Sequence, residues 1–197
     1  AALPLIFPAV QLDGGWYGDG GIRLTAPLSP ALHLGARRIL AISTRYARSD
    51  READQAIVPG YPPPAQVMGV LLNAVFLDLL DADALHMARI NQLLEALPAE
   101  RRADLRPVTL LTIRPSQDLG KLAGRYEPRL PGAFRFLTRG LGTRQTSSPD
   151  FLSLILFQPD YLRALIDLGE ADAEARIRQI EAFLQGEDPP APDSATD

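Results

Sequence analysis

Asp19 lies between Gly18 and the pair Gly20-Gly21, in a segment rich in turn-forming residues. Glycines let the backbone turn tightly and approach its neighbours closely, so they can hold a short carboxylate in one orientation. A carboxylate held in this way, and partly removed from water, can accept a hydroxyl proton without a histidine between them. The spacing therefore makes Asp19 a candidate general base, although Asp-Gly pairs are also common in turns that have no chemical role.

The segments around this turn predict the elements that would position it. Residues 3–10 contain too much proline for a helix and predict extended structure leading into the turn. Residues 29–35 predict one short helix, with a serine N-cap, a proline at its first position and a final glycine. Residues 38–44 are continuously apolar and β-branched, which is typical of a parallel strand buried on both faces.

Helices and one further strand are predicted in the middle of the chain. Residues 46–64 are polar and rich in proline, which indicates a surface loop long enough to invite a functional role. Residues 65–97 predict one long helix or two abutting helices, and residues 106–114 predict a second buried strand. The apolar residues at helical spacing are Val67, Val70, Leu71, Ala74, Ile90, Leu93, Leu94 and Leu97.

The remaining residues complete a single expected domain. Residues 116–148 predict helical pieces joined by loops, and three C-terminal helices follow, the last ending at Gly186. We expect one α/β unit over residues 1–186 and a disordered tail over residues 187–197.

The composition of the chain excludes several classes of partner and site. The chain has 197 residues and a formal net charge of -4, so it offers no broad attraction for nucleic acid, and we expect no nucleic-acid partner. The absence of cysteine excludes disulfides and thiolate metal ligands. It is compatible with the cytoplasm, which is the expected location, and equally with a bacterial exported protein. No apolar run reaches the roughly 18 uncharged residues of a membrane-spanning helix, so we expect any membrane contact to be peripheral.

The order of these segments resembles the patatin-like phospholipases. Residues 2–10 (ALPLIFPAV), residues 17–21 (YGDGG) and residues 26–43 (APLSPALHLGARRILAIS) follow the order of that family: an extended approach, Asp-Gly-Gly, a proline-containing helix and a strand. Residues 118–142 and 156–173 also look like the C-terminal region of bacterial members, although they are less specific than YGDGG. The resemblance thus covers nearly the whole chain.

The resemblance implies a fold and a chemistry. Members of the family cleave acyl esters of lipids with a serine–aspartate dyad on a three-layer α/β/α fold with a mostly parallel sheet, followed here by C-terminal helices. Asp19 would be the base that activates the serine, and Gly18, Gly20 and Gly21 would shape its turn, with no cofactor and no metal. Asp13 also precedes two glycines, but the helix and strand follow Asp19 at shorter range, so we expect Asp13 to form a surface hairpin turn.

The chain departs from the family pattern in one large respect. It contains no Gly-x-Ser-x-Gly and no glycine-rich oxyanion loop. Both normally precede the Asp-Gly-Gly segment, so we expect an upstream part of the same protein to supply them. We expect the chain alone to be inactive, because it lacks the nucleophile and the oxyanion donors. The alternative is a non-catalytic interaction or regulatory α/β domain.

Other polar residues have structural interpretations. His33 and His86 are the only histidines, too few for a histidine-dependent triad or a histidine metal site, and we expect them on helix surfaces or in the core. Asp78, Asp81 and Asp83 lack the glycine and the spaced glutamate of a calcium loop, so a solvated face or turn is expected.

Five more residues have side chains of a kind that could act as a nucleophile or contact a lipid. Ser29, Ser116 and Ser148 are better explained as helix N-caps than as nucleophiles. Trp16 and Tyr17 could touch an acyl chain, but aromatic residues beside a turn more often pack over the core, and we assign them no role.

Overall fold

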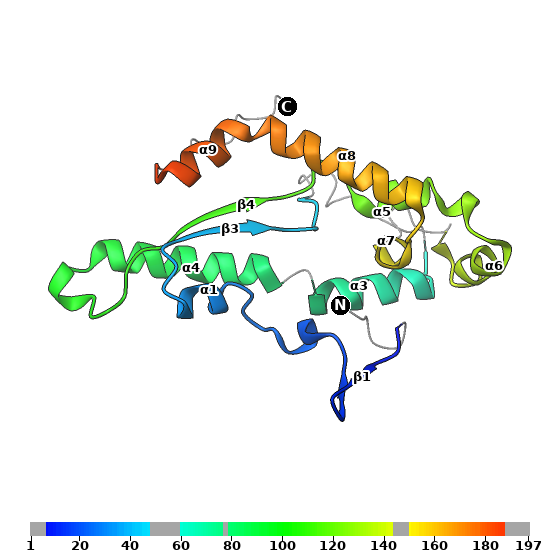
Figure 1. Ribbon diagram of the computed structural model, residues 1–197, viewed down its shortest axis with the longest axis horizontal. Coiled ribbons are helices and arrows are strands. Elements are labelled where there is room, and N and C mark those ends of the chain that lie inside the picture. Colours follow the sequence, from blue (N-terminus) through cyan, green and yellow to red (C-terminus); the bar gives the residue numbers. More distant parts are fainter. Residues whose placement is uncertain (1–6, 48–59, 77–78, 144–149, 188–197) are drawn as a thin grey trace.

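The computed structural model describes residues 7–47, 60–76, 79–143 and 150–187. Over these residues the fold is mixed α/β, with helices on both sides of a pair of parallel strands (Figure 1). The elements in chain order are β1 (Val10–Leu12), β2 (Gly15–Tyr17), the short 3-10 helix η1 (Gly20–Arg23), α1 (Ser29–His33), β3 (Arg38–Ile42), α3 (Pro64–Phe76), α4 (Leu79–Ala96), η2 (Ala99–Arg101), β4 (Thr109–Ile113), α5 (Leu119–Gly124), η3 (Glu127–Arg129), α6 (Gly132–Gly140), α7 (Asp150–Ile155), α8 (Pro159–Ala175) and α9 (Ile177–Gln185).

Strands β3 and β4 form the parallel pair, which confirms the α/β class predicted from the sequence. Arg38 lies opposite Thr109, and the register continues to Ile42 opposite Ile113. The two strands are shorter than the apolar runs that predicted them. A connection through α3 and α4 joins them, as parallel strands require a long crossover.

One face of this pair packs against α1 and α4. Ile39 and Ala41 of β3 form a buried cluster with Leu28, just before α1, and Met87 of α4. These residues come from alternate positions of the strand, because successive side chains of a strand point to opposite faces.

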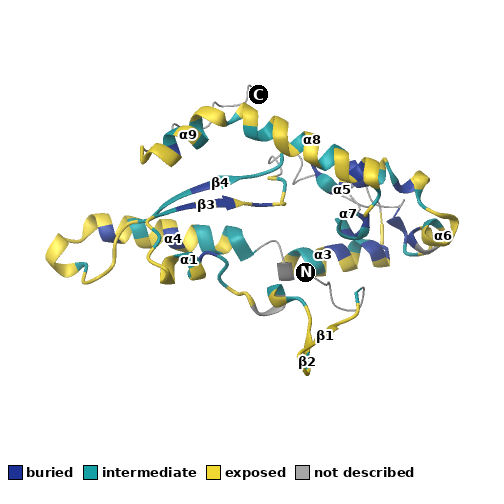
Figure 2. Ribbon diagram, viewed as in Figure 1, coloured by how far each residue is buried: buried dark blue, intermediate teal, exposed yellow. Residues whose placement is uncertain are grey.

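The other face is only partly covered, so the expectation that β3 is buried on both faces is wrong for this part of the chain. Leu111 of β4 is buried there, but its neighbours Leu40 and Ile42 on β3 are 40% and 77% exposed (Figure 2). Within the described residues β3 has a strand on one side only. Within the described residues, β3 is therefore an apolar strand with one unpaired edge and one partly exposed face.

The C-terminal helices are fastened to the start and end of the sheet by two arginines. Arg38 donates from Nε to the carbonyl oxygen of Phe183 at 3.0 Å, and its guanidinium lies 4.6 Å from the centroid of the Phe183 ring. Arg176, at the junction of α8 and α9, donates to the carbonyl oxygen of Thr112 at 3.1 Å. Arg38 thus adds a charged donor at the C-terminal end of α9, where cationic side chains are favoured, and Arg176 joins the helices to β4.

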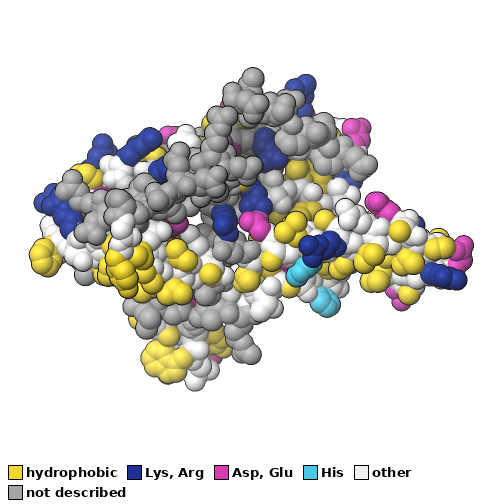
Figure 3. Space-filling model, turned by 180° about the vertical axis from the view of Figure 1, so that it is seen from behind, with side chains coloured by type: hydrophobic (Ala, Val, Ile, Leu, Met, Phe, Trp, Pro, Cys, Tyr) yellow, Lys and Arg dark blue, Asp and Glu magenta, His cyan; other side chains and the backbone are white. Residues whose placement is uncertain are grey.

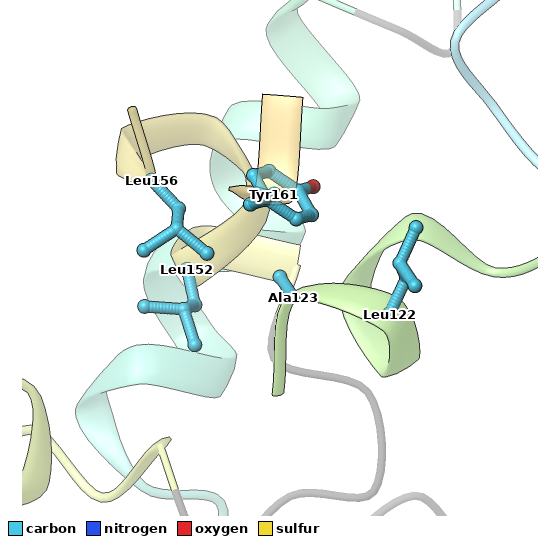
Figure 4. Close-up of a cluster of buried hydrophobic side chains, with 5 residues drawn as sticks. All are labelled: Leu122, Ala123, Leu152, Leu156 and Tyr161. Atoms are coloured by element: carbon cyan, nitrogen blue, oxygen red, sulfur yellow. The ribbon is translucent and has the colours of Figure 1, made fainter. Parts of the chain in front are cut away.

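A second core lies where α5, α7 and α8 meet. Leu122, Ala123, Leu152, Leu156 and Tyr161 form it (Figure 4). Helix α8 begins in this second core and leads into α9 beside the sheet, so it connects the second core to the sheet (Figure 1).

The apolar stripe predicted for residues 65–97 does form two helices, α3 and α4, but most of it is not core. Leu94 is buried, whereas Val67, Val70, Leu71, Ile90 and Leu93 are exposed. The segment Pro64–Ala96 is also long and apolar enough to cross a membrane by length and composition, an exception to the expectation that every apolar run is too short. Core helices of proteins in water pass the same test, so this is weak evidence.

The glycines of the sequence predicted where helices end better than the serines predicted where helices begin. Gly35 and Gly186 follow α1 and α9 with φ of 83° and 89°, the left-handed conformation typical of a residue that ends a helix. Ser29 is the first residue of α1 and its N-cap is Leu28, so the predicted serine cap is wrong by one residue.

Ser116 is also not a cap. Asp118 caps α5, since its Oδ1 accepts a hydrogen bond from the Lys121 amide at 3.0 Å, while the Ser116 amide donates to Asp172. Ser148 lies outside the described residues. So do most of the loop expected over residues 46–64, the start of the extended segment expected over residues 3–10, and the tail from residue 188.

Candidate functional site

Asp19 is half-buried and forms the N-cap of η1. Its backbone is extended, with φ of -73° and ψ of 121°, and its Oδ1 accepts a hydrogen bond from the Gly21 amide at 2.7 Å. This local bond fixes the carboxylate relative to the turn. Among the described residues Asp19 makes no further hydrogen bond or ion pair, so Oδ2 is available to a group from elsewhere.

The three glycines around Asp19 have different roles. Gly21 supplies the amide that orients the carboxylate. Gly18 and Gly20 do not have positive φ, and a Cβ atom at either position would meet nothing within 4 Å. These two glycines therefore leave the backbone open to close approach from outside rather than relieve a clash within the described chain.

Asp13 forms the hairpin turn that the sequence predicts. Asp13 and Gly14 connect β1 to β2 with φ of 46° and 82°, and Leu12 pairs with Gly15. Two central residues with positive φ are typical of a type I′ turn, for which Asp-Gly is a favoured sequence. Asp13 is exposed on this turn and has no part in the site around Asp19.

The Asp19 turn adjoins the carboxyl end of β3. Gly21 lines a cavity of about 440 Å³ together with Ser43 and Thr44, the residues that follow β3, and Leu80 of α4. The same cavity is also lined by β3 from Ile39 to Ile42, so it runs along the strand to its carboxyl end, and Asp19 is not among its lining residues. Thr44 also lines a larger neighbouring cavity, which no sequence motif indicated.

Trp16 and Tyr17 do not cover the core. The hairpin β1–β2 projects from the body of the molecule, and Trp16 is 71% exposed (Figure 1). Tyr17, Val10 and Leu12 are exposed as well. Seen from behind, a small group of hydrophobic side-chain atoms projects at the lower end of the molecule (Figure 3).

The aspartates of α4 also differ from expectation. Asp81 forms an ion pair with Arg114, and Asp83 accepts a hydrogen bond from the Leu28 amide at 2.8 Å. Both carboxylates are half-buried and connect α4 to other elements, so they do not form the expected solvated face. Asp78 lies outside the described residues. The partners are 33 and 55 residues away in sequence, so no local pattern could have predicted them.

Both histidines lie exposed on helices, one of the two expected placements. Among the described residues, His33 on α1 forms hydrogen bonds within its own helix turn, to Ser29. His86 lies on α4. No group of three or more potential metal ligands occurs in the part of the chain that the structure describes.

Comparison with known proteins adds no relative: no family model, no curated protein and no solved structure matches this chain. The patatin-like resemblance stays a prediction that depends on the residues themselves.

Proposed function

We propose that this chain is the aspartate-bearing part of a patatin-like serine lipid acyl hydrolase with a three-layer α/β/α fold. The observation that carries the proposal is the Asp19 carboxylate, half-buried and held by the Gly21 amide at 2.7 Å, with its second oxygen unengaged among the described residues. Gly21 of the same turn lines a cavity that reaches the carboxyl end of β3, and ligands of open α/β sheets bind beyond the carboxyl ends of their strands.

The chemistry follows from this geometry. A serine hydroxyl supplied by an upstream part of the protein would attack the ester carbonyl while Asp19 Oδ2 accepts its proton. The tetrahedral intermediate would then expel the alcohol, which takes the proton back from Asp19, and leave an acyl-serine. Water would release the fatty acid in a second step, with Asp19 again accepting and returning a proton.

The open surfaces support an upstream part of the protein at this place. Leu40 and Ile42 are exposed on a strand whose second edge is free of strand partners within the described residues. Strands of parallel sheets are normally covered on both faces inside a domain. The space around Gly18 and Gly20 would let the serine-bearing segment approach the carboxylate closely.

The projecting hairpin supports a peripheral contact with a lipid surface. Tryptophan and tyrosine, exposed here beside valine and leucine, are the side chains that favour the interface between a bilayer and water. The hairpin ends at Tyr17, two residues before Asp19, so such a contact would bring the carboxylate to the lipid.

The test is ester hydrolysis by the protein that includes the upstream segment. Asp19→Asn keeps the shape of the side chain but cannot accept the serine proton, so we expect turnover to fall by about 10²- to 10⁴-fold. Asp13→Asn is the matched control and should leave turnover unchanged, because Asn also tolerates positive φ. Full turnover by Asp19→Asn would contradict the proposal and favour the non-catalytic interaction domain instead.

A further inference from the structure

The larger cavity at the carboxyl ends of β3 and β4 has the features of a built binding site. It has a volume of about 770 Å³ and extends from Thr44, after β3, to the second core. Its polar lining comes from five further elements and includes Asn73, Arg114, Asp118, Asp150 and Tyr161. Side chains from this many elements meet only in the folded chain, which is why no motif indicated the cavity.

Tyr161 is the residue that points to a ligand. Its side chain is 1% exposed, yet its hydroxyl has no hydrogen-bond partner among the described residues. Figure 4 shows the hydroxyl at the end of the ring that points away from Leu152 and Leu156, and Tyr161 lines the cavity. Burial, with a smaller contribution from Tyr126, raises the pKa of Tyr161 to about 12, so the hydroxyl is a neutral donor under all ordinary conditions.

A buried hydroxyl without a partner lowers the stability of a fold, and such groups are rare in native proteins. Phenylalanine would fill the same space among Leu122, Leu152 and Leu156 without that cost. The hydroxyl is therefore explained most directly by a partner that arrives from outside the chain.

The charges around the cavity indicate the chemical class of that partner. Two arginines, Arg45 and Arg114, face three aspartates, and Arg114 is already paired with Asp81. Asp150 accepts a hydrogen bond from Asn73 at 2.8 Å, and Asp118 accepts one from the Lys121 amide at 3.0 Å. The described lining residues carry more negative than positive charge, which disfavours a phosphate or another anion. Carboxylates have several lone pairs each and can accept further hydrogen bonds from hydroxyl groups.

We propose that this cavity binds a neutral polyhydroxylated group, a sugar or polyol, whose oxygen accepts the hydrogen bond of the Tyr161 hydroxyl and whose own hydroxyls donate to the aspartates. The group could be a free sugar or the headgroup of a neutral glycolipid. The second source rests on the proposed lipid hydrolase function, whereas the first does not.

The proposal is tested by NMR titration of the chain with glucose, with octyl glucoside below its micelle concentration, and with inorganic phosphate. We expect the amides of Thr44, Gly120 and Ser153 to shift with the two sugars and not with phosphate. Equal affinity for both sugars would identify a free sugar as the ligand, and at least about tenfold tighter binding of octyl glucoside would identify a lipid headgroup. Shifts with phosphate alone, or with none of the three, would overturn the proposal.

Two tyrosine variants separate binding from folding. Tyr161→Phe should weaken sugar binding by about tenfold, as loss of one buried hydrogen bond to a ligand does, while its melting temperature stays equal or rises. Tyr61→Phe, at an exposed tyrosine outside the cavity, should change neither property. A lower melting temperature for Tyr161→Phe with unchanged sugar affinity would show a structural hydroxyl and end the proposal. Because the titration needs no ester hydrolysis, its result is independent of the test on Asp19.

Discussion

Glu127 shows how a single residue links elements that the sequence keeps apart. Its carboxylate is buried and, within the described residues, has no cation beside it. Glu127 Oε1 instead accepts hydrogen bonds from the hydroxyls of Thr138, at 3.0 Å, and Thr143. These bonds fasten η3 to the end of α6, and a buried carboxylate depends on them because it has lost its water.

Removing one of these donors should be costly. Thr143→Val keeps the shape of the side chain but leaves the buried carboxylate with one donor fewer, so we expect the free energy of unfolding to fall by about 1–3 kcal/mol. Thr25→Val, at an exposed threonine, is the control and should change it by less than about 0.5 kcal/mol. Urea denaturation measures both, and equal midpoints for the two variants would show that Glu127 does not depend on Thr143.

The sequence could predict single residues only where the physics is local. The Asp13-Gly14 turn and the αL glycines Gly35 and Gly186 were predictable, because backbone conformation at these positions depends on the residue itself. The unpartnered Tyr161 and the bond from Asp83 to the Leu28 amide were not, because their surroundings come from distant parts of the chain.

At the scale of elements, the contact between α3 and α7 depends on a glycine. A Cβ atom at Gly69 would lie 3.2 Å from the backbone nitrogen of Phe151. A flexible side chain could move away, but a helix backbone cannot do so without disturbing its packing.

Alanine should therefore have opposite effects at two helical glycines. Gly69→Ala should lower the free energy of unfolding by about 1–3 kcal/mol, because the overpacking outweighs the gain in helix propensity. Gly169→Ala on α8, where a Cβ meets nothing within 4 Å, should raise it by about 1 kcal/mol. Thermal and urea unfolding of the pair measure this difference. A stabilised Gly69→Ala would mean that the two helices are packed less closely.

The hairpin β1–β2 yields a second prediction at this scale, which is membrane contact. Trp16 is the single tryptophan, so its fluorescence reports on the hairpin alone. With neutral phosphatidylcholine vesicles we expect a blue shift of its emission, and Leu12→Asn should weaken vesicle binding several-fold because it removes buried apolar area.

Leu34→Asn is the control for that experiment, since Leu34 is exposed at the end of α1, away from the hairpin. It should bind vesicles as the wild type does. Emission that stays unchanged at saturating lipid would rule out contact through the hairpin.

The types of the elements were predictable from the sequence, but their surroundings were not. Apolar periodicity and helix-ending glycines predicted α3, α4 and the C-terminal helices, and the apolar runs predicted β3 and β4. The apolar run over residues 38–44 wrongly predicted that Leu40 and Ile42 are buried. Apolar character records that a residue is suited to burial, whereas burial itself requires a covering partner.

At the scale of the whole molecule, Tyr161 links stability to pH. The folded chain keeps the Tyr161 proton up to a pKa of about 12, while the unfolded chain releases it near the ordinary value of 10. Above pH 10 the unfolded chain thus binds fewer protons, and stability falls as the pH rises. The part of this loss that is due to Tyr161 should reach about 2 kcal/mol by pH 12.

Urea midpoints between pH 9 and pH 12 measure this effect. Stability should fall less steeply in Tyr161→Phe than in the wild type, because phenylalanine cannot ionise. Parallel curves for the two proteins would show that Tyr161 ionises equally easily in the folded and unfolded chains.

Within the described residues, the unpaired edge of β3, the exposed apolar side chains of α3 and the open surroundings of Gly18 and Gly20 led us to propose that further polypeptide carries the nucleophile. The most direct test of this account is the acylation step in the protein that includes the upstream segment. Mass spectrometry after rapid mixing with a p-nitrophenyl ester should show an acyl group on a serine of the upstream segment, formed rapidly in the wild type and at least about 100-fold more slowly in Asp19→Asn. Equally fast acylation in the two proteins would contradict the account, because the serine would then lose its proton without Asp19.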